Sequence, residues 1–496
     1  MESFTRSSGI LLHITSLPDK YGIGCMGREA REFIDFLKKS GQKLWQICPL
    51  GPTGYGDSPY QVYSAYAGNP LLIDIEQLVK SKLLLENDLS DAPEFNAQFV
   101  DYGKVLDYKG LLFRKAFTRF KKKEQKTFAD FTKRNADWLE DYVLFMALKT
   151  ANNNKSWMEW SPELRQRDKK VMAAKKKELS DEVKYQQFLQ YIFCEQWQKL
   201  KKYANEKGIK IIGDIPIYPA MDSADVWANP EYFQFDEEGI PIAVAGCPPD
   251  DFSVTGQLWG NPLYNWGKLE EDNFSWWVKR FAYMLNIVDI TRIDHFLGFE
   301  NYWSVKWGDP TAEKGEWKPG GGHKLFAAIE KELGKLPLIA EDLGVITPEV
   351  EKLRDDFNFP GMKILQFAFY DDNDNPYLPH NFPKNCVVYT GTHDNETTVG
   401  WFQNLPSHIK NHVRSYLSYL RFTDWEVAWK LIEAAFESQA VFAIAPLQDF
   451  IGLDNSARFN IPGTLGGNWR WRYMKGMLTD EMAAGILRLV RKSKRL

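Results

Sequence analysis

The sequence predicts an α/β fold, a (β/α)₈ TIM barrel with helical and irregular insertions after its second, third and seventh strands. Short apolar runs alternate with amphipathic segments, a pattern typical of parallel strands joined by right-handed helical crossovers. Eight such runs can be counted, the number of strands in this barrel. They lie near residues 10, 45, 212, 290, 339, 365, 389 and 443. Four of them end in an acidic residue, as expected where an active site is built at one mouth of the barrel.

The composition is that of a globular protein with a large core, because 44% of the 496 residues are hydrophobic and 26% are charged. The net charge of -4 argues against nucleic acid or an anionic membrane as a partner. No apolar run reaches the ~18 residues of a membrane helix, and the N-terminus lacks the regions of a signal peptide. We therefore expect a cytoplasmic protein. Five scattered cysteines without a CxxC pair predict neither disulfides nor a zinc site.

The chain is predicted to form a single barrel over residues 1–496, and its first strand is Ser8–Ser16. Gly27–Ser40 has helical spacing, and Lys43–Leu50 is the second strand. Residues 76–186 are rich in Lys, Glu, Phe and Trp and nearly free of Gly. This composition predicts an inserted helical subdomain after the second strand.

The third unit begins with a long amphipathic helix, Phe188–Lys207, which leads into the strand Ile209–Ile217. From Asp214 to Asp294 the chain runs for 80 residues (294 minus 214), whereas one barrel unit takes roughly 30. Residues 218–272 are therefore predicted to be a loop-rich insertion. Its many Pro, Gly and Trp residues suggest little regular structure.

The second half of the chain continues the alternation of strands and helices. The expected strands are Ile287–Phe296, Leu336–Gly344, Gly361–Phe369, Cys386–Thr392 and Val441–Leu447. The expected helices are Phe274–Asn286, Lys324–Leu333, Pro348–Asp356 and Asp480–Arg491, with an inserted helical segment over residues 395–439.

The fourth strand, Ile287–Phe296, is apolar and β-branched at its start and ionic at its end. Arg292 and Asp294 are two residues apart, so their side chains project from the same side of the strand. An adjacent arginine favours the charged form of a carboxylate, which suits a nucleophile. The alternative is a buried ion pair that only stabilises the strand.

Six polar residues lie at the C-terminal ends of four predicted strands, where a barrel brings side chains to one mouth. They are Asp214, Arg292, Asp294, Glu341, His393 and Asp394. Like charges brought together destabilise a fold, so this set indicates a functional site.

Paired carboxylates about 5–5.5 Å apart define a retaining glycosidase-type site. Asp294 suits the role of the nucleophile. Glu341 follows the apolar residues 338–340, which favours the protonated acid that must release the leaving oxygen. Asp342 would point to the opposite face and serve structure. Asp394 would hold sugar hydroxyls as the ring flattens toward an oxocarbenium ion.

Several stretches resemble the sequence blocks of the 4-α-glucanotransferases, also called amylomaltases or disproportionating enzymes, which form glycoside hydrolase family 77 of the α-amylase clan. They are Ser-Pro-Tyr-Gln (58–61), Gly-Asp-Ile-Pro-Ile-Tyr (213–218), Ile-Thr-Arg-Ile-Asp-His-Phe (290–296), Ala-Glu-Asp-Leu-Gly (340–344), Gly-Thr-His-Asp-Asn (391–395) and Asn-Trp-Arg-Trp-Arg (468–472). The stretch from Pro248 to Tyr264 is similar to the family's mobile loop over the acceptor sites. One departure is Asp251, where relatives often carry an aromatic residue.

The resemblance implies that Asp294 is the nucleophile, Glu341 the general acid/base and Asp394 the transition-state stabiliser. It also implies a set of substrate-binding residues. These are Ser58, Tyr60, Asp214, Trp259, Arg292, His393 and Asn395. The implied partners are α-1,4-glucans such as maltooligosaccharides, glycogen or starch chains, with glucose as acceptor. No cofactor or metal is implied, and a monomer or weak homo-oligomer is expected.

Other interpretations remain open at this point. An α-glucan hydrolase could use the same three acids, and a non-catalytic carbohydrate-binding barrel could have kept the fold. The glycines of residues 22–27 fit a dinucleotide fingerprint, but Leu17–Tyr21 separates them from the strand and no acid ends the second strand. Residues 371–376 alternate oxygen ligands like a calcium loop, but they lack its glycine and closing glutamate, which favours a solvated turn.

Overall fold

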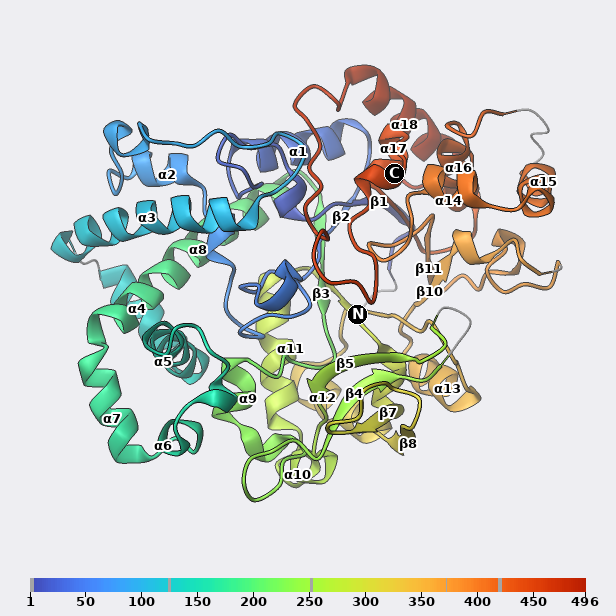
Figure 1. Cartoon of the computed structure of the whole chain (residues 1–496). Helices are drawn as coiled ribbons and strands as arrows, with labels where there is room; N and C mark the ends of the chain where they lie inside the picture. The colour runs from blue at the N-terminus through green and yellow to red at the C-terminus, as the bar shows by residue number, and fades with distance from the viewer. Residues whose placement is uncertain (1–3, 124–125, 250–252, 372, 418–421) are drawn as a thin grey trace.

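The computed structural model in Figure 1 describes residues 4–496 apart from 124–125, 250–252, 372 and 418–421. Eight parallel strands form one sheet in the order β10-β11-β12-β1-β2-β3-β6-β9. They are β1 (Ser7–Leu11), β2 (Leu44–Gln46), β3 (Lys210–Ile215), β6 (Ile290–Ile293), β9 (Leu338–Ala340), β10 (Gly361–Ile364), β11 (Cys386–Tyr389) and β12 (Phe442–Pro446). The amide of Ala340 donates to the carbonyl of Pro360 at 3.0 Å, which joins the two outer strands. The predicted (β/α)₈ barrel is confirmed.

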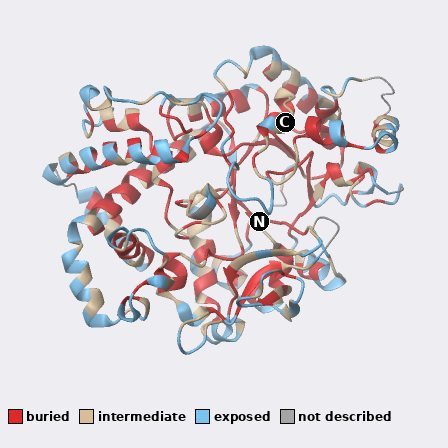
Figure 2. Cartoon of the chain, viewed as in Figure 1, coloured by how far each residue is buried: buried red, intermediate tan, exposed pale blue. Residues whose placement is uncertain are grey.

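The interior of the barrel is filled by alternate residues of each strand, because successive side chains of a strand point to opposite faces. Ile212, Ile290 and Ile339 belong to this inner cluster and are almost fully buried. The residues two positions further on are Asp214, Arg292 and Glu341, so the same alternation directs all three inward near the mouth. The other face of each strand packs on the surrounding helices, and the buried strands lie at the centre of the molecule (Figure 2).

The helices around the barrel follow the predicted order. They are α1 (Arg28–Lys39), α8 (Ser180–Glu206), α11 (Ser275–Ile287), α12 (Gly322–Leu333), α13 (Pro348–Asp356), α14 (Thr398–Asn404), α15 (Ser407–Tyr416), α16 (Val427–Glu437), α17 (Leu447–Ile451) and α18 (Asp480–Lys492). Helix α8 begins eight residues before the predicted Phe188. No helix in the described part of the chain is both long and apolar enough to cross a membrane.

Residues 76–186 form helices beside the barrel, on the left of Figure 1. They include most of α2 (Ile75–Lys80), then α3 (Tyr102–Phe120), α4 (Lys126–Arg134), α5 (Ala136–Ala151), α6 (Pro162–Arg165) and α7 (Lys169–Glu178). Aromatic side chains join them to α8, since Phe117 and Phe120 lie 5.6 and 4.8 Å from Phe188 between ring centroids. Packing of this kind favours a fixed position of these helices on the barrel.

Residues 218–272 contain more regular structure than the sequence suggested. Besides α9 (Ala224–Ala228) and α10 (Trp266–Glu271), they hold the antiparallel strands β4 (Ala243–Cys247) and β5 (Gln257–Pro262). Together with β7 (Asn301–Lys306) and β8 (Glu316–Pro319), these strands form a second sheet in the order β5-β4-β7-β8. The expectation of little regular structure was wrong because β4 pairs with a strand that follows β6, about 60 residues along the chain.

Asp342 has the structural role that its position in the sequence predicts. Its carboxylate accepts hydrogen bonds from Met362 N at 2.6 Å and from Arg354 Nη1 at 2.5 Å. Because Asp342 lies two residues beyond the end of β9 and Met362 lies on β10, this buried group ties together the two strands that complete the barrel.

We expect Asp342→Ala to lower the free energy of unfolding by about 3 kcal/mol, because it leaves the Arg354 guanidinium and the Met362 amide without their partner. Asp342→Asn should lose less, since it keeps an acceptor for Met362. The measurement is urea denaturation. The control is Asp356→Ala, which removes surface contacts with Lys352 and His323 and should cost less than about 1 kcal/mol. Equal losses for the two alanine variants would contradict this role of Asp342.

Candidate active site

A single buried guanidinium organises the mouth of the barrel. Arg292 Nη1 donates to both oxygens of Asp214, at 2.9 and 2.7 Å, and to Asp294 Oδ1 at 2.9 Å. Its other terminal nitrogen lies 4.0 Å from Glu341 Oε2. Asp214 and Arg292 are paired in the register of the neighbouring strands β3 and β6. The structure therefore brings together three of the predicted carboxylates, from three adjacent strands, around one cation.

Glu341 is held as a protonated carboxyl. Its burial raises the pKa to about 8, and the nearby charge of Asp294 adds to this effect, although Arg292 opposes it. Both carboxyl oxygens also accept backbone hydrogen bonds, Oε2 from His295 N at 2.5 Å and Oε1 from Leu343 N at 3.0 Å. Glu341 therefore has the protonation state of a general acid and a fixed orientation at neutral pH.

Asp394, in contrast to Glu341, is held as an ionised carboxylate. Burial acts to raise its pKa, but contacts with His393 and Asn460 outweigh this and hold the pKa well below the usual range. Asn460 Nδ2 donates to Asp394 Oδ1 at 2.6 Å, and His393 Nε2 lies 3.4 Å from Oδ2. Arg458 donates to the carbonyl of Asp394 at 2.6 Å. Sequence analysis missed Asn460 and Arg458, because no strand pattern marks their segment.

Tyr60 connects the Asp214 side of the site with the His393 side. Its hydroxyl donates to Asp214 Oδ2 at 2.8 Å and lies 3.4 Å from His393 Nδ1. Its ring stacks on the imidazole of His393, with centroids 4.9 Å apart and 20° between the planes. Trp469, from the C-terminal block noted in the sequence, packs 5.8 Å from Tyr60 and 5.7 Å from His393. Residues more than 400 positions apart thus form one wall.

Ser58 and Asn395 hydrogen-bond within their own loops. Ser58 Oγ accepts from Tyr60 N at 3.2 Å. Asn395 Oδ1 accepts from the amide and the hydroxyl of Thr392, at 2.9 and 2.8 Å. These contacts shape the turns that carry Tyr60 and Asp394.

Trp259 reaches the other side of the site from β5. Its ring lies edge-on to His295, with centroids 4.7 Å apart and planes at 90°. His295 follows Asp294 in a left-handed conformation, with φ of 52°. Burial lowers the pKa of its imidazole to about 4, so the ring is neutral at pH 7. His295 lies within a block that the sequence analysis quoted, but nothing in the pattern distinguished it from a packing residue.

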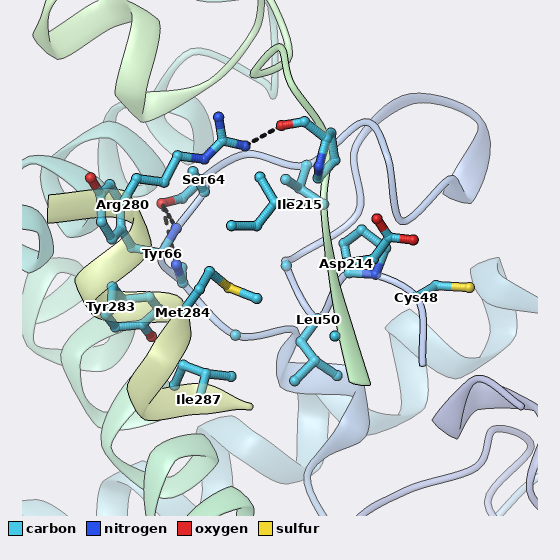
Figure 3. Close-up of a pocket in the computed structure, with 18 of the residues that line it drawn as sticks. Cys48, Leu50, Ser64, Tyr66, Asp214, Ile215, Arg280, Tyr283, Met284 and Ile287 are labelled. Atoms are coloured by element: carbon cyan, nitrogen blue, oxygen red, sulfur yellow. Dashed lines mark hydrogen bonds between the residues drawn. The ribbon is translucent and has the colours of Figure 1, made fainter. Parts of the chain in front are cut away.

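A cavity lies between β3 and α11, and it also borders the active-site residues Asp214 and Tyr60 (Figure 3). It is lined mainly by apolar residues, among them Leu50, Ile215, Met284 and Ile287. Arg280 borders it and donates to the carbonyl of Pro216 at 2.5 Å, which holds the chain that follows β3. Hydrogen bonds from Arg292 and Tyr60 fix the carboxylate of Asp214.

Two motifs weighed in the sequence have local explanations. A side chain at Gly24 would lie 2.0 Å from the carbonyl of Ile14, so this glycine permits close packing of the chain on itself. In the possible calcium loop, Asn375 donates to Asp371 at 3.2 Å and to Phe367 O at 3.1 Å. The described residues contain no cluster of three or more metal-ligating side chains. Residue 372 of that loop and the departure at Asp251 lie outside the described residues.

The fold and the site together define an enzyme class. A (β/α)₈ barrel with a protonated carboxyl beside a second carboxylate at its mouth is an arrangement found in enzymes that act on glycosidic bonds. Comparison with known proteins makes this class specific. The family model of the 4-α-glucanotransferases, glycoside hydrolase family 77, matches residues 12–478.

Close relatives agree with the family model. The 4-α-glucanotransferase of Clostridium butyricum is 50% identical over 484 residues, which cover 97% of this chain and 99% of the relative. That of Thermus thermophilus is 49% identical and covers 99% of both chains. The structure of the amylomaltase from Streptococcus agalactiae in complex with acarbose superposes with a TM-score of 0.96 at 41% identity, again over 99% of both chains. The chain belongs to the 4-α-glucanotransferase family.

We expect Arg292→Met to lower the free energy of unfolding by about 3 kcal/mol at pH 7, because it leaves buried carboxylates without their cation. The deficit should shrink as the pH falls toward 5, because burial raises the pKa of Asp214 and the loss of Arg292 removes the main opposing charge, so protonation relieves the uncompensated charge of Asp214. The measurement is urea denaturation across this pH range. Arg28→Met is the matched control, because it removes an arginine from an exposed pair with Glu29. A deficit that does not depend on pH would contradict the electrostatic account.

Proposed function

We propose that Asp294, Glu341 and Asp394 carry out disproportionation of α-1,4-glucans by a retaining double displacement. The observation that carries this proposal is that Arg292 contacts Asp294 and lies near Glu341, while burial keeps Glu341 protonated. An ionised nucleophile and a neutral acid beside one sugar are what the first displacement requires. Family membership favours this reaction over simple hydrolysis or carbohydrate binding alone.

In the first step, a carboxylate oxygen of Asp294 attacks the anomeric carbon of the donor sugar. The bond to the leaving oxygen breaks, and this oxygen takes the proton of Glu341. The product is a covalent glycosyl-enzyme, and Glu341 is now ionised. In the second step, Glu341 takes the proton of the acceptor's 4-hydroxyl, which attacks the same carbon and releases Asp294. Two inversions give net retention.

The remaining predicted residues bind the sugars in this proposal. Tyr60, Asp214, Arg292 and His393 hold the donor sugar at the cleaved bond, and ionised Asp394 binds its hydroxyls. Their hydrogen bonds to one another support a preorganised donor subsite. Ser58 and Asn395 complete this substrate-binding set from the adjoining turns. The complex of the Streptococcus agalactiae amylomaltase with acarbose supports an oligosaccharide ligand for this chain.

Trp259 forms the acceptor side of the site. Glu341 protonates the leaving group, so residues around Glu341 flank both the departing chain and the incoming acceptor. Trp259 packs on His295, whose amide holds Glu341. An acceptor sugar between this wall and Glu341 would exclude water, as transfer in place of hydrolysis requires.

The partners that we propose are maltooligosaccharides and glycogen or starch chains, with glucose as acceptor. The chain acts as a monomer or weak homo-oligomer, without nucleic acid or membrane partners, and in the cytoplasm. The relatives from rice and Arabidopsis thaliana are described as chloroplastic or amyloplastic.

Asp294→Asn should abolish transfer, because an amide cannot form the glycosyl-enzyme. We expect glucose release from maltotriose to fall by at least about 10⁴-fold. The urea denaturation curve and the binding of maltooligosaccharides measured by calorimetry should stay close to those of the wild type. Retained transfer in this variant would show that the nucleophile is misassigned. A wild-type enzyme that forms glucose and maltose from maltotriose, without longer oligomers, would favour the hydrolase instead.

The fall of kcat/KM at alkaline pH, the alkaline limb of the pH profile, should reflect the loss of the proton of Glu341. The raised pKa means that the carboxyl keeps its proton up to about pH 8, so kcat/KM should be sustained below this pH and fall above it. Glu341→Gln should lower the rate and remove this limb. The measurement is kcat/KM for maltotriose from pH 5 to 10. A limb that persists in the residual activity of the glutamine variant would assign the titration to another group.

A further inference from the structure

Asn261 lies where three segments around the site meet. Its Nδ2 donates to the carbonyl of Pro219 at 2.8 Å, and its Oδ1 accepts from Gln61 Nε2 at 3.1 Å. The side chain is buried, with 6% of the residue exposed. Gln61 directly follows Tyr60, Pro219 lies in the chain that follows β3, and Asn261 belongs to β5. One carboxamide therefore joins the segments that carry Tyr60, Asp214 and Trp259.

The geometry of β5 makes Trp259 depend on this junction. Gly260, between Trp259 and Asn261, has φ of 73°, a conformation that side chains rarely adopt. Trp259 is thus carried on a kinked strand, immediately before the hydrogen-bonded Asn261. Because β5 is at the edge of its sheet and pairs only with β4 among the described strands, the contacts at its ends determine where the indole lies.

The other end of β5 is supported by the turn between β7 and β8. The amide of Ala312 donates to Thr255 O at 3.1 Å, and Ala312 O accepts from Trp303 Nε1 at 2.9 Å. Ala312 is fully buried, and a Cβ at Gly256 would lie only 3.0 Å from its methyl group. The start of β5 is therefore held by close packing and its end by the carboxamide of Asn261.

These contacts connect two walls of the active site outside the barrel sheet. On one wall, Tyr60 donates to Asp214 and stacks on His393. On the other wall, Trp259 packs on His295, whose amide holds Glu341. The hydrogen bond from Gln61 to Asn261 runs between the segments that carry these walls. Movement of β5 relative to the loop of Tyr60 would widen the space between donor and acceptor sugars.

We propose that Asn261 is a positioning residue for the acceptor: it sets the distance between the Trp259 wall and the Tyr60 wall. It thereby controls how tightly the acceptor binds and how much water reaches the glycosyl-enzyme. This inference rests on the roles proposed above for Tyr60 and Trp259. Asn261 itself reaches neither sugar, because both ends of its carboxamide are occupied by protein groups.

The test is Asn261→Ala in the full chain, assayed with maltotriose as donor and labelled glucose as acceptor. Displacing a wall of the site by about 1 Å can cost up to about 100-fold, so we expect the KM for glucose to rise about 10-fold or more. The hydrolysed share of the donor should rise with it, because water competes better. The kcat at saturating glucose should stay within about threefold of the wild type, since the groups that react are untouched.

Asn265→Ala is the matched control. Asn265 is a nearby asparagine whose side chain accepts from Lys268 N at the start of α10. Its loss should lower stability, as the loss of a helix cap does, without changing the KM for glucose. Gln61→Ala adds a second variant, because the half-buried Gln61 reaches Asn261 through its side chain alone. Its effect on KM should not add to that of Asn261→Ala in the double variant.

An unchanged KM for glucose and an unchanged hydrolysed share in folded Asn261→Ala would overturn the inference. If that variant does not fold, Gln61→Ala and Trp303→Phe decide in the same assay, because each removes one support of β5. Failure of the proposed function looks different, since Asp294→Asn would then keep its transfer activity. An inactive Asp294→Asn together with normal acceptor kinetics in the Asn261, Gln61 and Trp303 variants would overturn the positioning role alone.

Discussion

The hydrogen bonds of Arg292 are the interaction on which the site depends. Three carboxylates from adjacent strands point into one buried space, and their mutual repulsion would oppose folding without a cation among them. The guanidinium contacts Asp214 and Asp294 directly and lies near Glu341. Of the three carboxyl groups, Glu341 lies farthest from the guanidinium, so the positive charge stabilises its ionised form least. Burial can therefore keep that carboxyl protonated. One cation among three acids therefore produces two protonation states, which is what acid-assisted nucleophilic attack requires.

The parts of the site that follow from strand periodicity could be predicted from the sequence. Asp214, Arg292 and Glu341 each lie two residues beyond a buried isoleucine of the barrel interior, and this alternation is visible in the sequence. The same rule separates Glu341 from Asp342, whose carboxylate instead binds Arg354 and the amide of Met362. Eight alternating units also indicated the barrel. Local periodicity predicts the side-chain directions reliably here because the strands are buried on both faces. One face packs in the barrel interior and the other packs on the helices.

The parts that depend on contacts between distant segments could not be predicted. Asn460 and Arg458 reach Asp394 from an irregular segment more than 60 residues away, and no spacing rule relates them. The second sheet was missed because β4 and β5 follow β3 whereas β7 and β8 follow β6. Each pair of strands is short and contains glycine or proline, so its pattern is interpretable only once its partner is known. The αL conformation that turns the amide of His295 toward Glu341 likewise has no signature in the sequence.

This division has a functional consequence. In the proposed mechanism the barrel strands supply the groups that make and break bonds, whereas the wall next to Glu341 comes from insertions after β3 and β6 that build their own sheet. The chemistry of a glycosyl-enzyme does not by itself distinguish a sugar hydroxyl from water, so the outcome depends on which of them occupies the space beside Glu341. A wall supported independently of the barrel can be adjusted to an acceptor sugar without disturbing the charges around Arg292. In this proposal, transfer and bond cleavage are controlled by different parts of the same chain, joined through side chains such as Asn261 and Gln61.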